Sequence, residues 1–196
     1  MGAVRAASSD TLDMHVTARP PTGSVERGFT LVELLIVVAI VGILAAVAVP
    51  GILRARIASL ESAAIGSMRA VNSAETTYAS SCGHGGYAQS LDDLSKPAAG
   101  SAQLFISPDV PANGVAKSGY VMNVSPDVSA SVVTVGASTC NAATLDAVSG
   151  YFAEGHPVSV GVSGQRSFAT DARGSLYVNV SGAIIAPGMG GASPIH

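Results

Sequence analysis

A single carboxylate stands in an almost fully apolar stretch near the start of the chain. Residues 27–50 have the sequence RGFTLVELLIVVAIVGILAAVAVP, and Glu33 is the one charged residue between Phe29 and Val49. About 20 consecutive apolar residues are enough for a helix to cross the core of a bilayer. Because a charged group inside such a span is costly, we expect Glu33 to serve a function and to need a partner.

The peptide bond between Gly28 and Phe29 is a candidate cleavage point, because it separates the basic Arg27 from the apolar stretch. A glycine permits the extended, unhindered backbone that a protease requires. Cleavage would create a new α-ammonium group on Phe29, about one helical turn from the carboxylate of Glu33.

Three roles for Glu33 are open at this point. Its carboxylate could pair with the new Phe29 amine of the same chain, which would offset part of the cost of burying both charges. The pair could instead form between two chains and fix the axial offset of one helix against the other. Alternatively, Glu33 could complement the positive end of the helix dipole and reach the membrane surface.

The elements that position these groups begin with a polar leader, residues 1–28, which shows no apolar periodicity. A long helix is expected over 29–81, with 29–49 as the membrane-spanning part. Pro50 and Gly51 should break or kink it, because proline lacks the N–H and clashes with the preceding turn. Beyond them an apolar stripe recurs at helical spacing; its members are Leu53, Ile57, Leu60, Ala64, Met68, Val71 and Tyr78. Arg54, Glu61 and Arg69 are expected on the polar side.

Residues 82–196 are expected to form a globular domain outside the cytoplasm. A loop over 82–117, with a short helical turn at 90–94, should lead into an antiparallel sheet over 118–182, followed by a flexible tail over 183–196. Runs rich in β-forming residues predict the strands; they are 119–124, 131–136, 149–155, 158–162, 166–172 and 175–180. Ala172-Arg173-Gly174 indicates a hairpin. The fold class is therefore α+β, with the helical stripe packed on one face of the sheet.

Composition excludes several classes of function. The net charge is −3 and only 12% of residues are charged, with no basic cluster, which argues against sequence-specific nucleic-acid binding. His15 lies in the leader and His196 in the tail, while His84 and His156 lie in predicted loops. No nucleophile elbow, metalloprotease motif or phosphate-binding loop is present, so we expect neither catalysis nor nucleotide hydrolysis.

The two cysteines, Cys82 and Cys140, both lie in Gly-, Ser- and Asn-rich surroundings typical of loops. If the domain lies outside the cytoplasmic membrane, they could form a disulfide; the alternative is a pair of free, partly buried thiols. Their spacing matches no zinc pattern.

The residues Gly28-Phe29-Thr30-Leu31-Val32-Glu33-Leu34-Leu35, the apolar run and Pro50 resemble the N-terminal signal of type IV pilins and of type II secretion pseudopilins. This resemblance implies that a prepilin peptidase cuts after Gly28 and methylates the amine of Phe29. It further implies that Glu33 meets the Phe29 amine of a neighbouring subunit during assembly. The segment around Pro50 would lose helical regularity in the fibre.

The resemblance implies a single-span precursor in the bacterial inner membrane, with its leader inside and its domain outside. This precursor would enter a surface or periplasm-spanning filament through an assembly platform and a motor ATPase, together with other pilins and further copies of itself. A pilus subunit for adhesion, motility or DNA uptake is the first reading; a secretion pseudopilin and a membrane-anchored binding module that never polymerises are the alternatives.

No cofactor is expected. Some pseudopilins bind calcium in a loop, and the carboxylates that could serve here are Asp92, Asp93, Asp109, Asp127 and Asp146. Their spacing matches no calcium-binding loop, so we expect solvated loop carboxylates instead.

Overall fold

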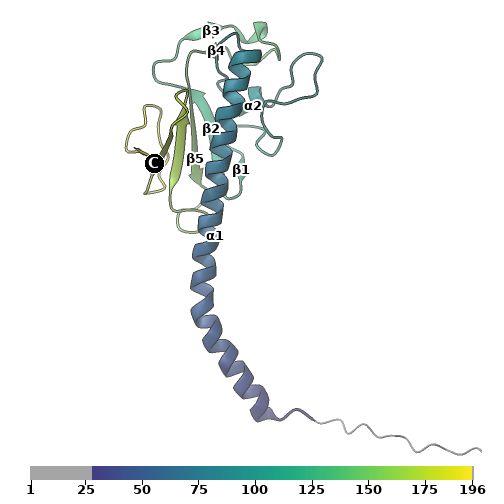
Figure 1. Cartoon of the computed structure of the whole chain (residues 1–196), viewed down its shortest axis with the longest axis vertical. Helices are drawn as coiled ribbons and strands as arrows, with labels where there is room; N and C mark the ends of the chain where they lie inside the picture. Colours follow the sequence, from purple (N-terminus) through teal and green to yellow (C-terminus); the bar gives the residue numbers. More distant parts are fainter. Residues whose placement is uncertain (1–27, 196) are drawn as a thin grey trace, which may run out of the picture. The chain divides into compact units, whose positions relative to one another are not determined.

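The computed structural model describes residues 28–195, so the predicted leader lies outside the described residues except for Gly28. The predicted α+β class is confirmed, with one long helix ahead of antiparallel strands (Figure 1). The elements are α1 (Leu31–Ser81), α2 (Leu91–Leu94), β1 (Ala116–Lys117), β2 (Tyr120–Pro126), β3 (Val132–Thr134), the 3₁₀ turn η1 (Gly136–Ser138), β4 (Ala147–Val148), β5 (Tyr151–Pro157), β6 (Ser167–Asp171), β7 (Leu176–Asn179) and β8 (Ser193–Pro194). Helix α1 contributes to two compact units, one ending at Leu44 and the other beginning at Ala45.

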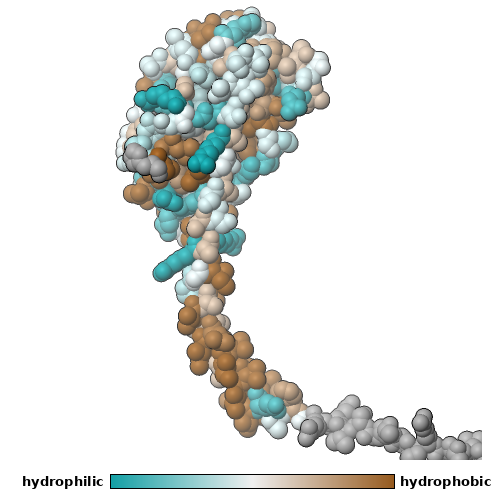
Figure 2. Space-filling model, in the orientation of Figure 1, coloured by the Kyte–Doolittle hydropathy of each residue, from teal (hydrophilic) through white to brown (hydrophobic). Residues whose placement is uncertain are grey.

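The first part of α1 is apolar all round. Figure 2 shows it as a continuous hydrophobic surface. The helix then continues through Pro50 without interruption, so Pro50 and Gly51 do not end it; the kink predicted there stays a prediction. A proline inside a helix removes a single backbone hydrogen bond, and the flanking turns keep the backbone helical here.

The second unit packs α1 against a six-stranded antiparallel sheet with the strand order β1-β2-β5-β6-β7-β8. Alternate residues of β2 point toward the helix and are buried, as the two-residue period of a strand requires. The shared core joins one stripe of α1 to the helix-facing side of the sheet; its main members are Ala64, Met68, Val71, Tyr78, Tyr120, Met122, Tyr151 and Phe168. A side chain at Gly155 would lie 3.2 Å from the Met68 sulfur, so the glycine makes room for the helix.

The far face of the sheet is covered by the C-terminal segment, and the predicted flexible tail over 183–196 is therefore wrong. Ile185 is fully buried against Phe152 of β5 and Ala169 of β6. Strand β8 then pairs with β7. The tail is ordered because these two strands carry apolar residues on both faces, and the second face needs a cover.

Two other strand predictions are corrected. Residues 158–162 form turns and an isolated bridge between Val160 and Gly164 in place of a strand. The run at 131–136 contributes β3, which pairs with β4 in a separate two-stranded sheet. The hairpin between β6 and β7 occurs where it was predicted, with Gly174 in the left-handed region that its turn requires.

Two carboxylates of α1 are buried, and one of them, Glu61, was predicted on the polar side. Glu61 accepts hydrogen bonds from the backbone N–H groups of Gln165 and Arg166, and its second oxygen pairs with the Arg166 guanidinium at 2.6 Å. Burial raises the pKa of Glu61, but these contacts together outweigh it and hold the pKa below its ordinary value. The prediction for Glu61 was wrong because a buried charge needs hydrogen-bond donors. Its donors belong to Gln165 and Arg166, which are distant in sequence.

Glu75 has far less compensation. Its side chain is fully buried, and only the Ala88 N–H donates to it, at 2.9 Å. Its other oxygen has no partner among residues 28–195, and neither do the hydroxyls of Tyr78 and Tyr151. Burial therefore raises the pKa of Glu75 well above its ordinary value.

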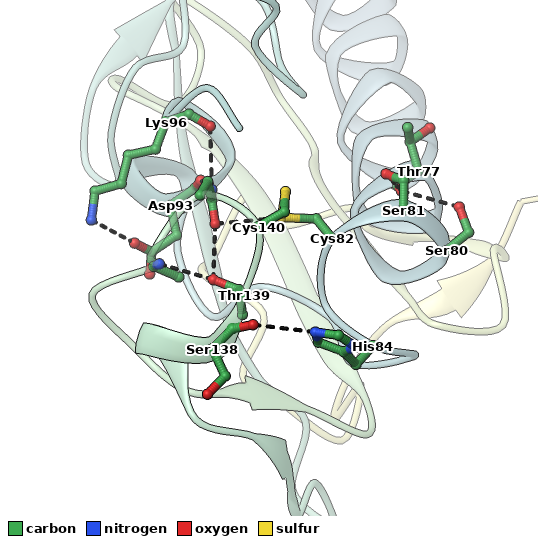
Figure 3. Close-up of a disulfide and its surroundings, with 12 residues drawn as sticks. Thr77, Ser80, Ser81, Cys82, His84, Asp93, Lys96, Ser138, Thr139 and Cys140 are labelled. Carbon is green, nitrogen blue, oxygen red and sulfur yellow. Dashed lines mark hydrogen bonds and ion pairs between the residues drawn. A yellow bond between two sulfur atoms is a disulfide. The ribbon is translucent and has the colours of Figure 1, made fainter. Parts of the chain in front are cut away.

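The cysteines form a disulfide that ties the end of α1 to the segment before β4. The Cα atoms of Cys82 and Cys140 are 4.7 Å apart. Figure 3 shows Cys82 directly after the last turn of α1, with His84 bonded to the carbonyl oxygen of Ser138 beside it. The bridge closes a loop between residues separated by 58 positions.

Replacement of Glu75 by glutamine is expected to raise the Tm at about pH 9 and to change it little at about pH 4. Since the folded-state pKa is raised, the wild type keeps its full stability below the unfolded-state pKa, about 4.3. It loses stability as the pH rises toward the folded-state pKa, whereas glutamine cannot ionise. Thermal unfolding in detergent solution across this range would measure the difference.

The Glu61→Gln variant is a matched control, for which the dependence of Tm on pH should run in the opposite direction. The folded-state pKa of Glu61 is lowered, so its contribution is present above the unfolded-state pKa and is lost as the pH falls through the folded-state pKa. This variant should have a lower Tm at neutral pH and should approach the wild type in acid. The same pH trend in both variants would contradict the two assignments.

Replacement of both cysteines by serine is expected to lower the free energy of unfolding by about 4 kcal/mol, because the unfolded chain regains the entropy of a long open loop. Denaturant titration with a fitted slope would measure the loss. Reduction of the wild type should reproduce it, and an unchanged free energy in both experiments would show that the bridge does not stabilise the unit.

Candidate functional site

The start of α1 carries the predicted processing and assembly residues, and its backbone is capped by a side chain. The Thr30 hydroxyl oxygen accepts a hydrogen bond from the Glu33 N–H at 3.2 Å, and the Thr30 carbonyl accepts one from the Leu34 N–H. Thr30 therefore occupies the N-cap position, and Glu33 is the third residue of the helix. The role of Thr30 as a helix cap was not predicted, although a Thr three residues before a Glu is the pattern of a capping box.

The Glu33 carboxylate remains available. It is exposed, and within residues 28–195 it accepts no hydrogen bond and forms no ion pair. In the uncut chain the Phe29 nitrogen is a neutral amide, so the partner that cleavage would create does not yet exist. The carboxylate lies in the first turn, where the helix dipole favours negative charge. The site can thus accept a cation at the start of α1.

The apolar stretch that follows has no cover within residues 28–195. Every residue from 28 to 56 is exposed. Exposed apolar surface of this extent marks contact with lipid or with another protein. By length and composition α1 is able to cross a membrane, and no residue of its most apolar stretch is buried. This segment is therefore a candidate surface for contact with lipid or with another protein.

The other candidate groups do not gather into a reactive site. His84 bonds to the backbone oxygen of Ser138, whereas His156 lies against Glu154 in β5. Among the described residues, no three His, Cys, Asp or Glu side chains lie close enough to hold a metal ion. The hollow beside the disulfide, of about 450 Å³, has no ionisable group in its lining, which includes Thr77, Gln103 and Phe105.

One of the five loop carboxylates was misjudged. Asp93 is buried, not solvated: it accepts hydrogen bonds from the Thr144 and Leu145 N–H groups and pairs with Lys96 at 3.0 Å. Burial raises the pKa of Asp93, but these donors outweigh it and lower the pKa overall. Asp93 therefore anchors the segment after Cys140 to α2, which is a structural role.

Comparison with known proteins points to the same end of the chain. The family described as "Prokaryotic N-terminal methylation motif" matches residues 23–49. A segment of 52 residues is 46% identical to the type IV major pilin protein PilA of Myxococcus xanthus (strain DK1622), and covers 26% of this chain and 24% of that protein. The match thus spans about a quarter of the length of this curated relative. No solved structure matches the chain.

The matched segment contains the candidate cleavage point, the capped helix start and the free carboxylate of Glu33. The helix that follows packs on an antiparallel sheet, which is the layout of the type IV pilin fold. By its N-terminal motif and by this layout, the chain is similar to type IV pilins.

Proposed function

We propose that the chain is a structural subunit of a type IV pilus-like filament and is made as a single-span precursor in the bacterial inner membrane. The observation that carries this proposal is the uncovered apolar half of α1, which bears one carboxylate, Glu33, in its first turn. A simple anchor needs the apolar surface but gains nothing from a charge inside it.

Processing supplies the partner for that carboxylate. A prepilin peptidase cuts between Gly28 and Phe29 and methylates the new amine, which can still carry a positive charge. The leader stays inside and the globular unit outside. Because the apolar stretch follows the cut, it remains in the mature chain, unlike the apolar region of an ordinary secretory signal.

Assembly exchanges lipid contacts of residues 29–53 for contacts with the same residues of other copies. Glu33 of one copy pairs with the Phe29 amine of its neighbour, and this pair sets the stagger of the two helices. The work of extraction comes from a motor ATPase acting through an assembly platform, since the chain has no phosphate-binding motif of its own.

A pilus for adhesion, motility or DNA uptake is favoured over a secretion pseudopilin, because the matched relative is named as a major pilin. The two readings share the motif and the assembly mechanism. They differ in the product, which is a cell-surface fibre for a pilus and a periplasm-spanning filament for a pseudopilin. Immunodetection of the chain in fibres sheared from intact cells would separate them.

Mass spectrometry of the purified mature chain is expected to show loss of residues 1–28 and one methyl group on Phe29. A Gly28→Val variant is expected to remain uncut, because the branched side chain hinders the extended backbone at the cleavage point. An uncut wild-type chain as the only species in cells would contradict the proposed processing.

The Glu33→Gln variant is expected to enter the membrane normally and to lower the yield of fibres by about tenfold or more, because removal of one member of a buried charge pair leaves the other uncompensated. Glutamine can still serve in a capping box, so this variant separates the charge from the helix cap. Electron microscopy and quantitation of sheared fibres would measure the yield.

Two variants control that experiment. Thr30→Ala removes the observed cap but keeps the Glu33 charge, and should lower fibre yield far less. Asp92→Asn removes an exposed carboxylate of the globular unit and should leave fibre yield unchanged. Normal fibres from the Glu33→Gln variant would show that Glu33 does not pair between subunits.

A further inference from the structure

The loop between β5 and β6 exposes three valines. Val158, Val160 and Val162 are 59%, 53% and 71% exposed, respectively. The loop is a defined structure, since Gly161 donates its N–H to the Gly164 carbonyl and Ser163 bonds back to Ser159. Three exposed valines on one ordered loop form a candidate contact surface.

This loop lies on α1 where the apolar stretch ends. Gly161 and Val162 line a shallow hollow of about 180 Å³ together with Leu53, Arg56 and Ile57. Figure 1 shows the end of β5 and the loop that follows it beside α1. The apolar surface of residues 45–53 therefore leads directly to the valines within one compact unit.

Three arginines surround the same place. Arg54 and Arg166 line a neighbouring hollow of about 310 Å³, and Arg56 lines the hollow below the valines. Arg54 and Arg56 have no acidic group within ion-pair distance among residues 28–195. The side chain of Arg166 remains 46% exposed although it pairs with Glu61. Hydrophilic side chains project from α1 where its hydrophobic surface ends (Figure 2).

We propose that these three arginines and the valines of 158–162 form a basal surface on which the globular unit rests on anionic phospholipid headgroups before assembly. This inference rests on the proposed precursor stage. Arg54 follows Val49 by about 7.5 Å along the helix, so it stands at the depth where a spanning helix leaves the hydrocarbon. Arginine side chains reach phosphates there, while valines enter the interfacial layer.

The charge of the surface selects lipid over a second copy of the chain. Among residues 28–195, Glu61 is the one acidic side chain that lines the two hollows, and it is buried and paired with Arg166. The surface thus carries excess positive charge where α1 would leave the bilayer. In the precursor it would therefore lie at the level of the lipid headgroups. The match of charge and position identifies an anionic bilayer surface as the occupant.

The chain has no tryptophan, so a single introduced tryptophan reports its own surroundings without background. The test uses the full chain with Val160→Trp, reconstituted into phosphatidylcholine vesicles with and without phosphatidylglycerol. Emission is expected to shift to the blue and to be quenched by brominated lipids when phosphatidylglycerol is present. Val162→Trp serves as a second reporter, because Val160 also packs near Gly182.

A matched control is Val132→Trp, a valine of β3 with 59% exposure. Strand β3 pairs with β4 beyond the C-terminal end of α1, and Ser81 lies about 30 Å along the helix from Glu61. This reporter should show no response to lipid. Unchanged unfolding curves and an intact disulfide would show that each variant is folded.

In the Val160→Trp background, the double change Arg54→Gln and Arg56→Gln is expected to weaken lipid contact. The ratio of tryptophans quenched by brominated lipid to tryptophans left unquenched should fall by about tenfold. Arg69→Gln, on the same helix about 20 Å further from the span, should leave the ratio unchanged. Raised salt should weaken the response, since exposed charges are screened.

The outcomes separate this inference from the proposed function. A chain that does not float with vesicles would overturn the precursor stage itself. A chain that floats while Trp at 160 and 162 stays solvent-like would overturn the basal surface alone. A blue shift of the emission that does not depend on phosphatidylglycerol but increases with protein density would assign the surface to contacts between copies. That result would overturn the lipid contact.

Discussion

The first half of α1 exposes an apolar surface that no other part of the described chain covers. Such a surface calls for a cover from lipid or from another protein, and both environments have a low dielectric constant. A charge in either environment, such as that of Glu33, is tolerated only where a partner compensates it. The capped helix start, the candidate cleavage point and the position of the arginines after the apolar stretch are all consistent with this one requirement.

The globular unit is held to the same helix by a different arrangement. Apolar residues of α1 fill the face of the sheet, and Glu61, buried among them, connects the helix to the segment before β6 through Arg166. Glu75 sits one heptad after Met68, at full burial and with one donor. The unit thus combines one well-compensated acid with one that is poorly compensated, and the two respond to pH in opposite directions.

Much of this architecture was predictable from the sequence, because the apolar run after Phe29 and the helical stripe around Met68 each have an unambiguous period. The same period places Glu61 and Glu75 on the buried stripe, seven residues before and after Met68. Their charge argued for the surface, and the donors that permit burial come from Arg166 and Ala88, distant in sequence. The cap at Thr30 was also visible in the sequence as a Thr-x-x-Glu pattern.

The exposed valines of 158–162 could not be told from a strand, since β-branched residues alternate in the same way whether they face a core or solvent. The ordered tail was equally hidden, because its burial depends on apolar residues on the second face of β5 and β6. The disulfide was foreseeable only as one alternative, since two cysteines in loops give no distance between them.

The bridge between Cys82 and Cys140 has a mechanical consequence. In the proposed filament under tension, the pull on each subunit would enter through α1, and a covalent link at the end of that helix would pass the load to the segment before β4. Separation of the helix from the sheet would then stop at the disulfide. The segment between Cys82 and Cys140 is closed by the bridge and would not be extended. A stretched subunit would keep this closed segment intact, and the helix and the sheet could pack on each other again once the tension is released.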